Sequence, residues 1–187
     1  QLHKLPLLSF RTKMPRIVGI AQHDMNRPSL NVKSIDALPG ANGSLRAKAQ
    51  MLLLINSVTD KAKRVRHTQA TDYLLDVNEQ LCDLPGLPGK PAKPVLVHPS
   101  RLKTRAVGTL EGRAGLIHAL THIEANAIGL ALDMMWRFPG MPGAFYLDWW
   151  QVAQEEALHF DLLQAHLSTL GFNYGDFPAH DGLWDMA

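Results

Sequence analysis

Two long helical segments, separated by a short turn rich in proline and glycine, place the strongest constraint on the fold of this chain. The first covers residues 109–138, with Thr109 as its N-cap. Residues 139–143, Pro-Gly-Met-Pro-Gly, stop that helix, and the second helix is expected over 144–170 with Gly171 directly after it. Helices joined by so short a turn pack side by side and antiparallel. The expected fold class is therefore all-α.

Each long segment carries an apolar stripe at helical spacing that charged groups interrupt. In the second segment the stripe is Phe145, Trp149, Val152, Glu156, His159, Leu163, His166 and Leu170. In the first it is Ile117, Leu120, Glu124, Ala127, Ala131, Met134 and Phe138. Seventeen residues separate Glu124 from Met141 at the turn, and 15 separate Met141 from Glu156. Because both helices rise ~1.5 Å per residue, the two carboxylates are expected at nearly the same height.

Charged groups within an apolar stripe are costly unless they are paired or coordinated. Glu156 and His159 form a Glu-x-x-His pair, and Glu124 is a lone carboxylate on the neighbouring helix. Ferritin-like bundles hold iron or manganese with this combination of ligands. We therefore predict that these three residues are metal ligands. The alternatives are a buried Glu–His ion pair or a helix face turned to solvent. The sequence contains one Glu-x-x-His pair, which is half of a two-metal ligand set.

Three more histidines and two aspartates lie near this pattern. His118 and His122 are four residues apart, a spacing that can bind zinc, but they project away from Glu124, so a structural or supporting role is expected. His166 either lines a cavity beside the ligands or packs in the core. Asp148 and Asp161 flank the predicted site and are candidates to hydrogen-bond a ligating histidine.

Composition and periodicity divide the 187 residues into four regions. They are an extended basic arm (1–42), an N-terminal helical segment (43–83), a proline-rich strap (84–105), and a helix pair with the start of a third helix (106–187). In the N-terminal segment, one helix is expected from a cap at Ser44 to about Val58, and another over 68–81. Asp181 is the expected cap of the third helix.

The strap contains five prolines between residues 85 and 99, which exclude a regular helix. It is interpreted as a strap packed on a protein surface, with a linker or an SH3-type ligand as alternatives. The single cysteine, Cys82, excludes an internal disulfide and fits a reducing compartment, cytoplasmic or mitochondrial matrix. A net charge of +2 is no argument for nucleic acid, and no apolar run reaches the ~20 residues of a membrane span. The first residue, Gln1, indicates a processed chain or part of a longer one.

Several motifs from residue 111 onwards resemble the DUF455 family of ferritin-like proteins. They are EGRAGLIHALTHIEANAI (111–128), RFPGMP (137–142), FYLDW (145–149), EEALHF (155–160) and YGDFPAHDGLW (174–184). The resemblance implies a four-helix bundle in which Glu124, Glu156 and His159 bind metal. It also implies two further helices, carrying another Glu and a second Glu-x-x-His, which this sequence does not contain. Residues 1–83 resemble the family only loosely.

Two functions are compatible with such a half-site. The first is an iron or iron–manganese protein that acts as an O2-dependent oxidoreductase on a substrate the sequence does not identify. The second is a degenerate, non-catalytic subunit of a larger, possibly mitochondrial, assembly. Because a two-helix hairpin cannot bury both of its faces, a protein partner is expected. A homodimer would supply two Glu and two Glu-x-x-His. A longer chain would complete the ligand set within one molecule, and in a hetero-assembly another subunit would cover the exposed face.

Overall fold

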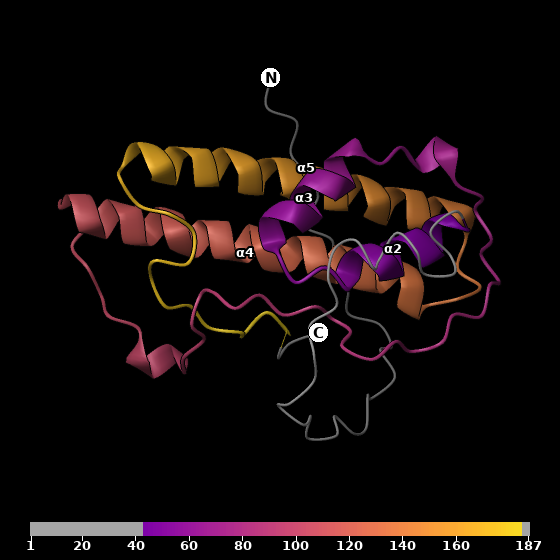
Figure 1. Cartoon of the computed structure of the whole chain (residues 1–187), viewed down its shortest axis with the longest axis horizontal. Helices are drawn as coiled ribbons and strands as arrows, with labels where there is room; N and C mark the ends of the chain where they lie inside the picture. The colour runs from indigo at the N-terminus through magenta and orange to yellow at the C-terminus, as the bar shows by residue number, and fades with distance from the viewer. Residues whose placement is uncertain (1–42, 185–187) are drawn as a thin grey trace.

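The structure is a computed structural model, and it describes residues 43–184. The predicted arm (1–42) and residues 185–187 lie outside this part. The described chain contains four α-helices and no β-strand, which confirms the predicted all-α class. The helices are α2 (Leu45–Leu53), α3 (Val58–His67), α4 (Leu110–Arg137) and α5 (Gly143–Thr169), and two short 3-10 helices, η1 (Ala70–Asp72) and η2 (Pro99–Arg101), lie in the connections (Figure 1).

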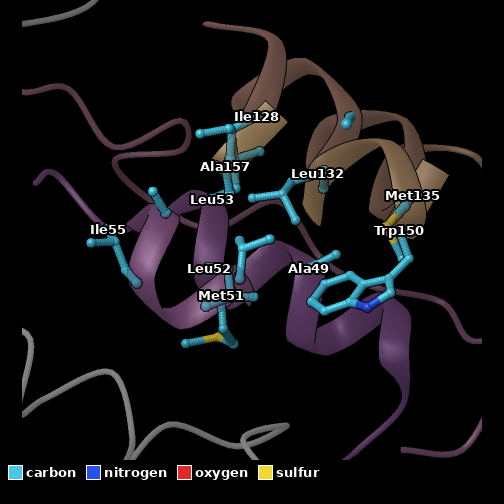
Figure 2. Packing of buried hydrophobic residues seen from close by; sticks show 14 of the residues in the cluster. Ala49, Met51, Leu52, Leu53, Ile55, Ile128, Leu132, Met135, Trp150 and Ala157 are labelled. Atoms are coloured by element: carbon cyan, nitrogen blue, oxygen red, sulfur yellow. The ribbon is translucent and has the colours of Figure 1, made fainter. Parts of the chain in front are cut away.

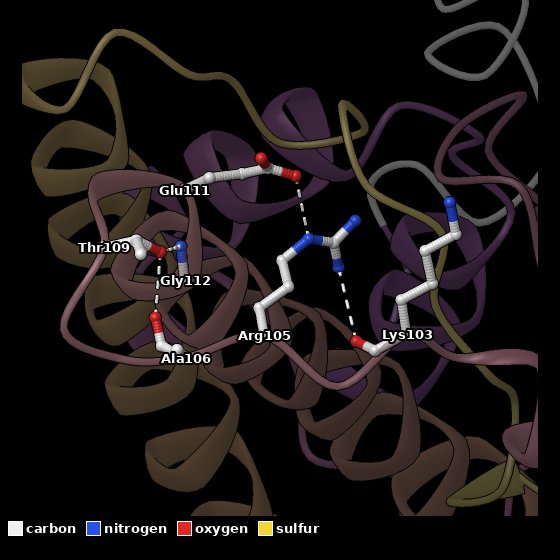
Figure 3. A network of polar contacts seen from close by, with 6 residues as sticks. All are labelled: Lys103, Arg105, Ala106, Thr109, Glu111 and Gly112. Carbon is white, nitrogen blue, oxygen red and sulfur yellow. Dashed lines mark hydrogen bonds and ion pairs between the residues drawn. The ribbon is translucent and has the colours of Figure 1, made fainter.

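The start of α4 is fixed by the predicted cap and by an ion pair. The Thr109 side chain accepts a hydrogen bond from the Gly112 amide at 3.0 Å, and Arg105 Nε donates to Glu111 Oε1 at 2.9 Å (Figure 3). A Cβ atom at Gly112 would lie 1.8 Å from the Ala106 carbonyl oxygen, so this close turn admits only glycine. The cap and the acidic first turn together explain why the helix begins here.

A tyrosine holds the turn between α4 and α5. The buried Tyr146 hydroxyl donates to the Phe138 carbonyl at 2.7 Å and accepts from the Met141 amide at 3.0 Å. At the far end of α5, Gly171 has the positive φ (+82°) that favours glycine after a helix. The hairpin is therefore closed at one end by side-chain hydrogen bonds, and both predicted long helices are confirmed within one residue.

The two short helices pack across one face of the hairpin, α2 against α4 and α3 against α5. Figure 2 shows the buried core between them. Leucines of α2 meet Ile128, Leu132 and Met135 of α4, and Trp150 of α5 packs beside Ala49.

Arg46 of α2 is 1% exposed, and its guanidinium donates to the Met135 and Trp136 carbonyls at 3.1 and 2.7 Å. It thus satisfies carbonyls at the C-terminal end of α4, where a positive charge is favourable.

The predicted helix over 68–81 is wrong. The second helix is α3, ten residues earlier, and residues 73–83 form an irregular run along the core. Ser57 caps α3 by accepting from the Asp60 amide at 3.2 Å, and Asp60 lies in the first turn. Tyr73, Val77 and Leu81 still pack against the core, but from an irregular backbone.

The proline-rich strap packs on its own chain. The Gly89 amide donates to the Leu53 carbonyl at 2.9 Å, at the end of α2. Further along, residues 95–97 pair with Ala179 of the C-terminal segment (170–184) through two backbone hydrogen bonds of 2.8 and 3.0 Å. Strap and C-terminal segment therefore run together beneath α4 (Figure 1). A turn follows the expected cap Asp181, and the Trp184 amide donates to the Asp181 carbonyl at 3.0 Å.

The fully buried stripe of α5 is not the one predicted. It consists of residues one position further along, namely Tyr146, Trp150, Ala153, Ala157, Phe160 and Leu167. The predicted stripe is half-buried or exposed along most of α5. A one-residue step turns a helix by about 100°, so the predicted stripe lies at the edge of the core, where Phe145, Trp149 and Val152 still pack against it and Glu156 and His159 face the uncovered side of the hairpin. None of the described helices is long and apolar enough to cross a membrane.

Candidate metal centre

The three predicted ligands converge at the middle of the hairpin. Glu124 comes from α4, and Glu156 and His159 come from α5, where a spacing of three residues places them on one face. His159 Nδ1 lies 3.2 Å from Glu156 Oε2 and 4.0 Å from Glu124 Oε2. One ligand atom from each residue lies within 4.8 Å of the others. Among the described residues this is the only cluster of three or more His, Cys, Asp or Glu side chains that could hold a metal ion.

The Glu124 and Glu156 carboxylates are close enough for the negative charge of Glu156 to disfavour ionisation of Glu124. Partial burial and the neighbouring Glu156 carboxylate raise the pKa of Glu124 to about 7, while the positive charge of His159 acts in the opposite direction. The side chains of Glu124 and Glu156 are 21% and 24% exposed, whereas that of His159 is 51% exposed. The site therefore lies at the open edge of the folded part, with its carboxylates turned inward.

The donor set fits a divalent metal ion. Carboxylate oxygens and an imidazole nitrogen bind such ions at about 2.0–2.2 Å, so ligand atoms about 3–4 Å apart can share one ion. The distances from His159 Nδ1 to the two carboxylates lie in this range. Mixed carboxylate and imidazole ligation suits iron, manganese and zinc. Three protein ligands leave further coordination positions for water, substrate or additional side chains.

His118 and His122, two of the three further histidines near the predicted ligands, have structural roles. Buried His118 accepts a hydrogen bond from the Gly175 amide through Nε2 at 2.9 Å. His122 Nε2 lies 3.0 Å from the His180 carbonyl, which can only accept, so Nε2 carries the proton. Its Nδ1 then accepts from the Tyr174 hydroxyl at 2.8 Å. Both rings fasten the C-terminal segment to α4 on the side away from the metal site, as the sequence predicted.

The other residues that were predicted to lie beside the ligands have different surroundings. Asp161 pairs with Arg66 of α3 at 2.5 Å, so the proposed support of a ligating histidine is wrong for this residue. Asp148 is exposed, and within the described chain no hydrogen bond joins it to His159. His166 is exposed and lines a cavity of about 360 Å³ on the same side of the hairpin as the ligands. The remaining lining is Val107, Arg113, Leu116, Ile117 and Leu170.

Comparison with known proteins identifies the family. The sequence matches the family described as "Protein of unknown function (DUF455)" over residues 53–187. This chain belongs to the DUF455 family. An uncharacterized protein of Haemophilus influenzae is 51% identical over 101 residues, which cover 50% of this chain and 35% of the relative. The DUF455 chain thus spans about a third of that relative's length. No solved structure matches it.

Sequence reasoning placed Leu120 on the apolar stripe of α4 but missed Leu116 and Ile123, which extend that stripe on the DUF455 chain. Leu116, Leu120 and Ile123 are 47%, 38% and 46% exposed, and they lie beside Glu124 on the uncovered side of the hairpin. The signal was present in the sequence, because Leu116, Leu120 and Ile123 are four and three residues apart, the spacing of residues on one face of a helix. The α4 helix is apolar on two faces, and only one of them is packed against α2 and the C-terminal segment.

Proposed function

We propose that this DUF455 chain is a ferritin-like metal protein that binds iron or manganese through Glu124, Glu156 and His159 and serves as an O2-dependent oxidoreductase. The observation that supports it most strongly is the convergence of these three donors at mid-length of two long helices. Partial burial and the neighbouring Glu156 carboxylate raise the pKa of Glu124 to about 7, so the ionised carboxylate is costly to the fold, and a bound cation removes that cost. A Glu–His ion pair alone would not require the second carboxylate.

Each ligand has a distinct part in this proposal. The two carboxylates neutralise the charge of the cation, and Glu124 gives up its proton when the ion binds. His159 presents Nδ1, the ring nitrogen that faces both carboxylates. Leu120 and Ile123 border the site with apolar surface, which restricts water once this side is covered. When bound, iron or manganese would supply the redox chemistry with O2, and the protein would supply position and charge.

A second function is favoured by the exposed apolar stripe on α4. Contiguous apolar surface on a folded protein marks an interaction site. In this alternative the DUF455 chain is a non-catalytic subunit of a larger assembly, and the Glu–His cluster is a remnant that binds no metal. The strap forms backbone hydrogen bonds with α2 and with the C-terminal segment of its own chain, so the support for this alternative rests on the stripe of α4.

The test is metal content in variants with matched controls. Protein purified without chelators is exposed to Fe(II) or Mn(II), and bound metal is counted by elemental analysis. Glu156→Ala and His159→Ala should each lose the metal. Glu155→Ala and His166→Ala are the controls, because both residues are exposed and lie outside the cluster. Metal that persists in Glu156→Ala and His159→Ala would reject the ligand assignment. A folded protein that takes up no metal would favour the structural subunit.

A further inference from the structure

We propose that the cavity at the open end of the α4–α5 hairpin binds the carboxylate of an amphipathic aliphatic acid, whose hydrocarbon chain extends along the hairpin toward the metal ligands. The open end is the one where α4 begins and α5 ends, opposite the turn (Figure 1). The inference rests on the proposed function and adds the substrate class to it. It concerns a small ligand held by residues of this chain, so it requires no second copy and no further ligand of the metal.

The cavity has an apolar wall that the fold holds in place. Its volume is about 360 Å³, at the lower end of the range of small-molecule sites, ~300–1,000 Å³. Ile117 of α4 and Leu170 at the end of α5 line it, and both also pack against a small core. That core consists of Ala114, Leu167 and Phe177. A wall supported in this way offers a preformed surface to an apolar ligand.

Two basic side chains line the same cavity, one from each helix. Arg113 of α4 donates through Nη1 to the Gly108 carbonyl at 3.3 Å, and no acidic side chain among the described residues forms an ion pair with it. Its remaining N–H groups match the geometry of a carboxylate. His166 of α5 is exposed and offers a ring N–H in either protonation state. An apolar wall beside these donors selects an amphipathic anion.

The charge of the connecting segments favours an anion at this end. Residues 98–113, which lead into α4, contain four lysines or arginines and one acid, Glu111, which already has an arginine partner (Figure 3). Residues 69–89 contain four acids and no lysine or arginine. The Gly140 amide donates to the Val77 carbonyl at 2.7 Å, which places this acidic run at the turn. The field between the two ends therefore draws an anion to the cavity and away from the turn.

An apolar path joins the cavity to the metal ligands. Each helix carries a stripe of residues, three and four positions apart, that leads from one to the other. In order from the cavity, the stripes are Arg113, Ile117, Leu120 and Glu124 on α4, and His166, Leu163 and His159 on α5. The helices contribute jointly to the cavity at one end of these stripes and to the ligand cluster at the other. Only apolar side chains lie between the two on the stripes.

The spacing sets the length of the ligand. At a rise of ~1.5 Å per residue, His166 lies ~10 Å from His159 along the helix axis, and Arg113 lies ~16 Å from Glu124. An extended chain of single bonds advances ~1.2 Å per bond, so these spans correspond to roughly 9–13 bonds. A saturated acid of about ten to twelve carbon atoms then reaches from Arg113 to the ligands. The proposed oxidoreductase would act near the methyl end of such a chain.

Binding is measured first on the whole chain without metal, by calorimetric titration with dodecanoate below its micelle concentration. We expect one dodecanoate per chain. Hexanoate, which is too short, and dodecyltrimethylammonium, which is a cation, should each bind at least tenfold more weakly. Arg113→Gln and Leu116→Glu should each raise the Kd for dodecanoate at least tenfold, because Leu116 also lines the cavity.

The matched controls are Lys63→Gln and Leu158→Glu, which should bind dodecanoate as the wild type does. Lys63 is exposed on α3, and Leu158 is 40% exposed on α5, close to the 47% of Leu116; neither control residue lines the cavity. Circular dichroism confirms that each variant is folded.

The direction of the bound chain is measured after loading with Mn(II), which broadens the NMR signals of nearby protons. The terminal methyl of dodecanoate should broaden more strongly than the methylene beside the carboxylate, with Zn(II) as the diamagnetic reference. Glu156→Ala should still bind dodecanoate but show no such difference, because it loses the metal.

The outcomes separate this inference from the proposed function. Uptake of Mn without binding of dodecanoate overturns the carboxylate site and leaves the metal-binding function standing. Dodecanoate binding that is unchanged in Arg113→Gln or Leu116→Glu, or equalled by dodecyltrimethylammonium, also overturns the site. Broadening that is strongest beside the carboxylate overturns the substrate class. A chain that binds dodecanoate as expected but takes up no Mn overturns the proposed function, and with it the substrate role, and supports the carboxylate site.

Discussion

Acid should weaken the attachment of the C-terminal segment, because His118 must stay neutral to hold it. Its Nε2 accepts the Gly175 amide proton at 2.9 Å, and a protonated ring cannot accept. Burial, with a smaller contribution from the charge of His122, lowers the pKa of His118 from 6.5 to about 4. In the unfolded chain the ring has its ordinary pKa of about 6.5. Between these two values the unfolded state binds more protons than the folded state, so stability falls as the pH falls.

The magnitude follows from the two pKa values. With values of 6.5 and about 4, the linkage amounts to roughly 2 kcal/mol between pH 7.5 and pH 5, and to about 3 kcal/mol once the pH is below 4. Glu124 acts in the opposite direction, because its pKa of about 7 means that the folded state takes up a proton as the pH falls. The prediction is therefore stated as the difference in the pH dependence of unfolding free energy between two proteins that share every titrating group except His118.

The comparison is wild type against His118→Gln, since the glutamine amide oxygen can accept from Gly175 and does not titrate. Urea unfolding at pH 7.5 and pH 5 should show that the wild type loses about 2 kcal/mol more than the variant. His166→Gln, at an exposed histidine, is the control and should behave as wild type. Hydrogen exchange of residues 172–180 should rise in acid in the wild type only. The same loss of stability in wild type and His118→Gln would refute the reasoning.

Three further variants test the packing around the site. Arg46→Met should lower the free energy of unfolding, measured in urea, by about 3 kcal/mol, because the buried carbonyls of Met135 and Trp136 lose their charged donor. Arg66 is the control: its side chain is half-exposed, so Arg66→Met should lower the free energy of unfolding by less than about 1 kcal/mol. Gly129→Ala places a Cβ 2.8 Å from the Trp184 ring, so it should lower the free energy of unfolding by about 1–3 kcal/mol and speed proteolysis of the C-terminal segment. Gly115→Ala is the control and should have neither effect, because its Cβ would lie 3.4 Å from its nearest neighbour. Glu124→Gln should raise the melting temperature of the metal-free protein at pH 8 and weaken Mn binding, and a melting temperature unchanged or lowered at pH 8 would contradict the repulsion between Glu124 and Glu156.

Local sequence signals were sufficient for the long hairpin. A threonine cap, an acidic first turn, a proline–glycine stop and a glycine after the last residue each act on the backbone within one turn. They therefore predicted α4 and α5 within one residue at each end. The convergence of Glu124, Glu156 and His159 could be predicted for the same reason, since a short turn fixes the relative height of two antiparallel helices.

Tertiary packing determines the backbone conformation of residues 73–83, which sequence patterns did not predict. Tyr73, Val77 and Leu81 have helical spacing, yet they meet the core from an irregular run in which the Leu74 carbonyl accepts from the Leu45 amide. The helix that does form, α3, is largely polar, and its signal was the Ser57 cap with Asp60 in the first turn. Apolar spacing alone does not distinguish a helix from an irregular segment that rests on a surface.

The offset between the ligand stripe and the buried stripe is what connects the fold to the proposed function. On α5 the core residues Trp150, Ala153 and Ala157 are covered by the N-terminal helices, whereas the stripe that carries Glu156 and His159 is offset from theirs by one residue, about 100° around the helix. A helix that is apolar on two faces lies between two layers of protein. The described chain provides one of these layers. The ligands lie on the other face, so any protein layer that packs on that face, from this chain or from another, would also close the site.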